Sequence, residues 1–129
     1  FEKVAVNINV DMVGRSEGDV TAYTVGEGGV FNKAREMGQK NGISVKADPF
    51  PAWRIIYFID SYHFARFDVP FVEIFTEMHE DYHQPSDETD RINFGKLVVI
   101  TDLVEDLTQY YASGGEREKF DRPSWFRTP

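Results

Sequence analysis

The chain has 129 residues and a net charge of −8, is 41% hydrophobic and contains no cysteine. This length is enough for one domain with a hydrophobic core, and the acidic charge argues against a nucleic-acid partner, because phosphate contacts need clustered Lys and Arg. Without cysteine, disulfides and thiolate metal sites are excluded, so any metal ion must be held by His, Asp or Glu. The sequence lacks the run of about 18 or more apolar residues that a membrane span needs.

The first half of the chain is predicted to combine strands with one helix. Residues 3–14 (KVAVNINVDMVG) alternate strictly, with Val and Ile on one side, which predicts a β-strand. A second strand is expected over 19–26 (DVTAYTVG), and the intervening RSEG favours a β-hairpin between the two strands. An apolar stripe predicts a helix over 28–42, and a short strand is expected over 43–47.

The second half is predicted to alternate in the same way. A short helix is expected over 62–68, a buried strand over 69–76, and a polar irregular segment over 77–93. Helical spacing of apolar residues predicts a long amphipathic helix over 94–113, followed by a C-terminal tail at 114–129 that Trp125 and Phe126 are expected to anchor. These elements indicate an α/β fold with a mixed, mostly parallel β-sheet flanked by helices.

The string HEDYH at 79–83 matches H-E-x-x-H, in which two histidines one helical turn apart hold zinc. Such a zincin site needs the middle of a stable helix. Pro85 follows closely, and a proline inside a helix would cost roughly 3 kcal/mol. The stretch between the 69–76 strand and Pro85 is also short for a stable helix. Glu105, on the predicted long helix, is placed where a third ligand could sit, so the zincin remains an alternative.

Three stretches are more informative together than HEDYH alone. They are NINVDMVGR (7–15), IDSYHFARFDVP (59–70) and HEDYHQPSDETDRIN (79–93). In this order they resemble the motifs N-x-D-M-x-G-R, S-D-H-x-x-F-A-x-x-G-I-P and H-x-D-Y-H-x-P-S-D-x-x-D-x-I-N of the M28 family of metallopeptidases, which includes many dinuclear zinc aminopeptidases. The resemblance corresponds to the C-terminal part of the catalytic domain and implies a zinc-exopeptidase-like fold, present here as a partial domain.

The resemblance also implies a set of site residues. Asp11, expected at the end of a central strand, would bind one zinc ion, and His83 would bind the other. Tyr82 matches a tyrosine that in some members donates a hydrogen bond to the oxyanion of the tetrahedral intermediate. Each of the three also has an ordinary reading, as a turn former, a polar surface residue or a half-buried tyrosine. The residues expected to support the ligands or to line the pocket are Asp60, Asp87, Asp90 and His79.

The sequence departs from the family pattern in two places. The Asp-His pair of S-D-H reads Asp60-Ser61 here, and the histidine comes later, as His63. The family's first ligand histidine, its bridging aspartate and its Glu-Glu pair all precede the motif that contains Asp11, and none of them is in this chain. Because a catalytic zinc usually needs three protein ligands, and because the chain begins with Phe1, we expect a piece of a longer protein that is inactive alone.

The function implied by the resemblance is hydrolysis of peptide bonds by a water molecule that two zinc ions activate. The expected partners are a peptide substrate and the missing N-terminal part of the same domain, and export to the periplasm or the extracellular space is favoured. Two further alternatives stay open. One is a non-catalytic interaction module that keeps the fold, and the other is a single-zinc relative that cyclises N-terminal glutamine.

Overall fold

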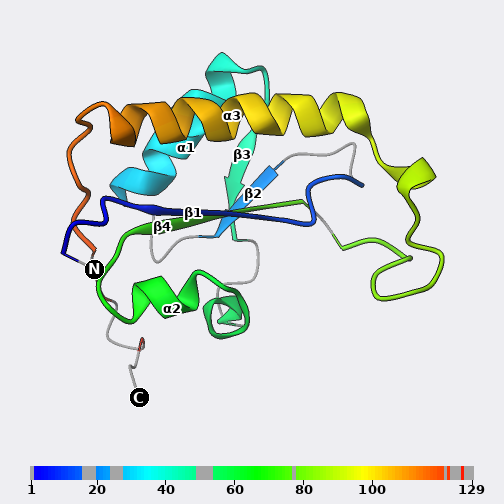
Figure 1. Cartoon of the computed structure of the whole chain (residues 1–129), viewed down its shortest axis with the longest axis horizontal. Coiled ribbons are helices and arrows are strands. Elements are labelled where there is room, and N and C mark those ends of the chain that lie inside the picture. Colours follow the sequence, from blue (N-terminus) through cyan, green and yellow to red (C-terminus); the bar gives the residue numbers. More distant parts are fainter. Residues whose placement is uncertain are drawn as a thin grey trace.

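The computed structural model describes residues 2–15, 20–23, 28–48, 54–76, 78–120, 122 and 126. A four-stranded sheet lies between two layers of helices (Figure 1). Its strands, in the spatial order β1-β4-β2-β3, are β1 (Asn7–Asp11), β4 (Phe71–Phe75), β2 (Val20–Tyr23) and β3 (Val45–Ala47). β1 runs parallel to β4 and β2 parallel to β3, while β4 and β2 are antiparallel. The predicted mixed, mostly parallel sheet is confirmed.

The predicted hairpin between the first two strands is wrong, because β4 lies between β1 and β2. Glu73 of β4 aligns with Asn9 of β1 on one side and with Tyr23 of β2 on the other. Strands adjacent along the chain pair only as a tendency, and β4 is buried throughout 71–74, as suits a strand with two neighbours. β1 is consequently an edge strand of the described sheet, so among the described strands Asp11 ends an edge strand and not the central strand that was expected.

The β1 strand is shorter than its alternating sequence predicts. Its ladder begins where the N–H of Asn7 donates to the carbonyl of Pro70 at 2.9 Å. The next bond toward the N-terminus would need an N–H at residue 70, which proline lacks. The alternation itself is retained, since Ile8 packs against the main hydrophobic core while Asn9 reaches Glu73 on the opposite face.

Two helices cover one face of the sheet, as predicted. They are α1 (Gly29–Lys40) and α3 (Phe94–Ala112), and they pack on Val72 and Ile74 of β4 in the main core. Asn93 is the N-cap residue of α3, and its side chain accepts a hydrogen bond from the Lys96 N–H at 3.0 Å. The residues that the two helices bury are Val30, Phe31, Ala34, Gly38, Ile100, Leu103, Leu107 and Tyr111.

The other face carries the 3₁₀ helix η2 (Ile55–Phe58) and the short helix α2 (Tyr62–Ala65). The predicted helix at 62–68 ends early, and Asp68 has a positive φ of 57°. From the tail, Phe126 is buried against Phe71 and stacks on Tyr57 at 6.0 Å between ring centroids. Phe126 thus anchors the tail as expected, whereas Trp125 lies outside the described residues. Of the helices in the described part of the chain, none is long and apolar enough to cross a membrane.

Candidate functional site

A pocket of about 610 Å³ opens beside the carboxyl end of β1. Because β1 and β4 are parallel, Asp11 at the end of β1 aligns with Phe75 at the end of β4, and the loop that follows β4 supplies the opposite wall. Ligands of open α/β sheets bind at such carboxyl ends. Five of the predicted site residues line this pocket: Asp11, His79, Tyr82, His83 and Asp87.

The other two predicted site residues, Asp60 and Asp90, do not line this pocket. Asp60 is exposed in the turn between η2 and α2, where its carbonyl accepts a hydrogen bond from the His63 N–H at 3.2 Å. Asp90 is exposed in the 3₁₀ helix η3 (Thr89–Arg91). Support of a metal ligand by either carboxylate therefore remains a prediction.

The HEDYH segment forms consecutive turns instead of a helix. The Tyr82 N–H donates to the His79 carbonyl at 3.1 Å, and the Gln84 N–H donates to the Asp81 carbonyl at 2.8 Å. The Glu80 side chain is 87% exposed and lies 3.9 Å from the Arg91 guanidinium. Because the two histidines do not share one face of a helix, the segment lacks the geometry of a zincin site.

Two residues that line the pocket, Met12 and His83, have left-handed backbone conformations, with φ values of 52° and 57°. Such conformations cost energy for any residue with a Cβ and are found where the surrounding structure enforces them, often at functional sites. The Met12 carbonyl accepts a hydrogen bond from the Thr76 hydroxyl. The imidazole of His83 stacks on the Tyr82 ring, with 3.9 Å between centroids. Both backbone bends lie on the walls of the candidate site.

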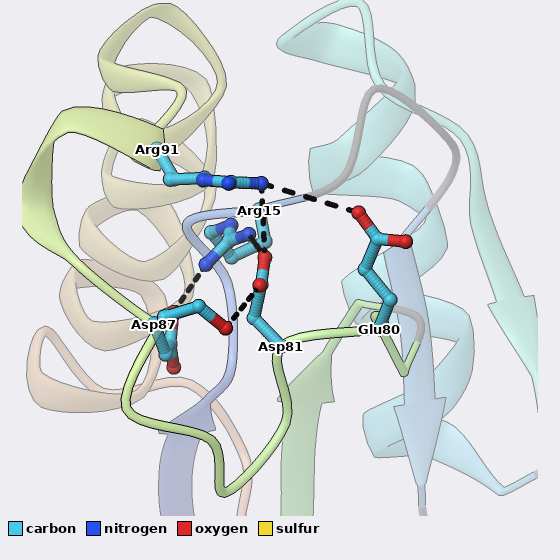
Figure 2. A network of polar contacts seen from close by, with 6 residues as sticks. Arg15, Glu80, Asp81, Asp87 and Arg91 are labelled. Carbon is cyan, nitrogen blue, oxygen red and sulfur yellow. Dashed lines mark hydrogen bonds and ion pairs between the residues drawn. The ribbon is translucent and has the colours of Figure 1, made fainter.

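A network of charged groups joins the two walls of the pocket (Figure 2). The guanidinium of Arg15 donates hydrogen bonds to Asp81 and to Asp87. The Ser86 hydroxyl donates to Asp81 at 2.6 Å and Arg91 donates to it at 3.3 Å. The hydrogen bond from Ser86, followed by that from Arg15, holds the pKa of Asp81 below its ordinary value.

Neither Arg15 nor Asp81 was among the residues expected at the site. Both stand at fixed positions of the motifs described above, Arg15 closing N-x-D-M-x-G-R and Asp81 preceding Tyr82-His83 in H-x-D-Y-H. The signal was therefore present, although nothing in either motif says that the two side chains meet.

The residues of the pocket supply the donor types of a zinc site, but in small number. The Asp11 carboxylate and the His83 imidazole are groups that zinc binds, and they come from two different segments. The Nδ1 atom of His79 is buried and has no hydrogen-bond partner within the described part of the chain. Among the described residues, no group of three His, Asp or Glu side chains is placed to hold a metal ion. The donor chemistry fits zinc, while a site of three protein ligands needs groups beyond these.

Comparison with known proteins finds a similar fold and a matching family. The structure is similar to an aminopeptidase from Aneurinibacillus sp. strain AM-1, with a TM-score of 0.70 and 20% sequence identity over 99% of this chain. The match spans 30% of the length of that aminopeptidase chain, and at this identity it shows the fold alone. The model of peptidase family M28 matches residues 1–108, so the chain belongs to that family. No curated protein matches the chain.

Proposed function

We propose that this chain forms part of a zinc-dependent aminopeptidase that hydrolyses peptide bonds. The observation that carries the proposal is that Asp11 and His83, which come from separate segments of a chain of peptidase family M28, line one pocket. The same pocket carries further carboxylates, including Asp87 and Glu88. An acidic pocket suits a substrate whose terminal ammonium group enters first.

Three residues of the pocket have proposed roles in the reaction. Asp11 and His83 would each bind one of two zinc ions. Bound zinc supplies Lewis acidity toward a water molecule and toward the scissile carbonyl. The Tyr82 hydroxyl would donate a hydrogen bond to the oxyanion that develops during attack. Tyr82 is 37% exposed and lines the pocket, which supports this role.

The remaining ligands and the general base would come from another part of the same catalytic domain. Three observations support this. The chain spans 30% of the length of the similar aminopeptidase chain, its described residues offer no three-ligand group, and β1 has a neighbour on one side only within the described sheet. The 40% exposure of Val10 on this edge strand is consistent with a surface that another segment covers. The chain by itself is therefore proposed to be inactive.

The test compares this chain with the longest native polypeptide that contains it. Bound zinc and hydrolysis of a peptide with a free amino end are measured for both. We expect the longer polypeptide to bind zinc and to cleave the peptide, and both properties to be lost in Asp11→Asn and His83→Gly. Asp102→Asn, on the exposed side of α3, is the matched control and should retain both properties.

Two other outcomes would replace the proposal. Cyclisation of a glutamine-led peptide in place of hydrolysis would identify a relative of the glutaminyl cyclases. Absence of both zinc and activity in the longer polypeptide would identify a non-catalytic module that retains the fold.

A further inference from the structure

We propose that Arg15 is a positioning residue that fastens the loop carrying Tyr82 and His83 to the end of β1, so that Asp11 and His83 face one pocket. The consequence for zinc binding rests on the proposed function. The fastening itself rests on contacts between side chains of this chain and can be tested without any metal.

The guanidinium of Arg15 holds the loop on both sides of His83. Its Nη2 atom bonds to Asp81, which precedes His83, and its Nη1 atom bonds to Asp87, which follows it. Figure 2 shows Arg15 lying between the two carboxylates. Two bonds from one planar group restrict orientation as well as distance. The loop is thus restrained at two points that flank the proposed ligand.

Several hydrogen bonds within the described loop join one of its residues to another. The backbone N–H of Gln84 donates to the Asp81 carbonyl at 2.8 Å, and that of Asp87 donates to the Gln84 carbonyl at 3.1 Å. Ser86 likewise bonds to Asp81 inside the loop. These hydrogen bonds define turns without attaching them to the sheet, whereas the two contacts of Arg15 cross from the loop to the β1 segment.

The backbone that carries Arg15 is itself anchored. The carbonyl of Gly14 accepts a hydrogen bond from the Asn93 N–H at 2.7 Å, which ties the end of β1 to the start of α3. The Met12 carbonyl is bonded to Thr76 at the end of β4. Because this backbone segment is bonded to both α3 and β4, the position of Arg15 is restrained relative to the core.

Burial separates Arg15 from the second arginine of the network. The side chains of Arg15 and Asp81 are 12% and 7% exposed, so water screens this ion pair little. Arg91 is 48% exposed, and its nearest contacts to Asp81 and Glu80 are longer, at 3.3 and 3.9 Å. Exposed pairs of that kind contribute little to stability. Arg91 therefore serves as an internal control, being an arginine of the same network with weaker contacts.

The experiment uses the longest native polypeptide that contains this chain. It measures loop order by NMR in the metal-free form and zinc affinity by competition with a chelator. In Arg15→Ala we expect backbone order parameters over 79–88 to fall from about 0.85 to below about 0.6. Zinc affinity should fall about 10- to 100-fold, the usual range for residues that orient a metal ligand. Arg15→Lys should recover part of the affinity, because one ammonium group does not reproduce the planar fork that bonds both carboxylates.

Two control variants separate positioning from general stability. Arg91→Ala should leave loop order and zinc affinity near those of the wild type. Arg122→Ala removes an arginine that pairs with Asp68 at 2.7 Å, before β4 begins, and should also leave both unchanged.

The outcomes separate this inference from the proposed function. If Arg15→Ala lowers only the melting temperature, or if Arg15→Lys behaves as the wild type, the positioning role is overturned. If the wild-type longer polypeptide binds no zinc, the proposed function fails, and the loop order of Arg15→Ala still decides whether the arginine fastens the loop.

Discussion

Asn9 on β1 and Glu73 on β4 lie side by side, and the Asn9 amide donates a hydrogen bond of 2.6 Å to Oε1 of Glu73. The Ser61 hydroxyl donates a second bond of 2.6 Å to Oε2. A carboxyl group that is only 1% exposed therefore joins β1, β4 and the segment that leads into α2. Burial raises the pKa of Glu73, and the charges of Asp11 and Asp60 raise it further, against the lowering effect of the two hydrogen bonds.

This raised pKa predicts how stability varies with pH. The folded protein holds the Glu73 proton more tightly than the unfolded chain does, so this contribution to stability is complete below pH 4.5 and is lost as the pH rises through the folded-state pKa. Glu73→Gln should remove that decline, because glutamine keeps an acceptor for Asn9 and offers a donor to Ser61. Urea unfolding across this pH range tests the prediction, and parallel profiles for the two proteins would contradict it.

The matched variant Glu73→Ala removes the acceptor altogether. It leaves the polar groups of Asn9 and Ser61 without their partner in a buried environment, so we expect it to be less stable than Glu73→Gln by about 1–3 kcal/mol. Equal stability of the two variants would mean that the hydrogen bonds to Glu73 contribute nothing.

The positive φ of His83 predicts a difference between two variants that both remove the imidazole. His83→Gly should be more stable than His83→Ala by roughly 1 kcal/mol, because only glycine adopts this backbone conformation without a Cβ penalty. Denaturant unfolding measures the difference. Zinc affinity, if His83 is a ligand, should fall equally in both variants. Equal stabilities would show that the loop does not retain its left-handed residue.

Gly38 in α1 is predicted to resist substitution. A Cβ at this position would lie 2.5 Å from Cγ2 of Val45 and 3.0 Å from the Ile43 carbonyl oxygen. Overpacking of this kind costs about 1–3 kcal/mol, which exceeds the gain of up to about 1 kcal/mol from replacing glycine by alanine in a helix. Thermal unfolding should therefore show Gly38→Ala to be destabilised.

The control for Gly38 is Gly95, in the first turn of α3. A Cβ there meets only Oδ1 of Asn93, at an ordinary 3.5 Å. Gly95→Ala should be as stable as the wild type or more stable, by up to about 1 kcal/mol. If both alanine variants gained stability, the close packing of α1 on β3 would be refuted.

The substitution Tyr111→Phe is predicted to stabilise the folded protein. Its ring is buried in the main core, and its hydroxyl has no hydrogen-bond partner among the residues described. Removing a buried polar group that lacks a partner should stabilise the protein by about 1 kcal/mol. Tyr82 lines the pocket and is not buried in the core, so Tyr82→Phe should show no such gain in stability when the variants are compared by chemical denaturation. Destabilisation by Tyr111→Phe would reveal a partner for this hydroxyl.

Local patterns were sufficient for the helices and insufficient for the order of the strands. The apolar stripes of α1 and α3 predicted both helices, because a helix that packs on a sheet must bury one face. The hairpin failed because the position of β4 depends on contacts with strands distant along the chain. Nothing in the alternation of residues 3–14 indicates that Glu73 will align with Asn9.

The residues of the candidate site could be predicted only where a family motif names them. Resemblance placed Asp11 and His83 together, and both line the same pocket. Their binding of zinc stays a prediction. The contact of Arg15 with Asp81 was missed because a charged side chain in a motif has many available partners, and only the folded loop selects one.

The edge position of β1 also matters for handling the isolated chain. An edge strand presents unpaired backbone donors and acceptors, which are a template for pairing with another molecule. Val10 on this edge strand is 40% exposed. Recombinant preparations of the chain alone are therefore expected to self-associate through β1 as their concentration rises. A lysine at position 10, as in Val10→Lys, should keep them monomeric by making that pairing unfavourable.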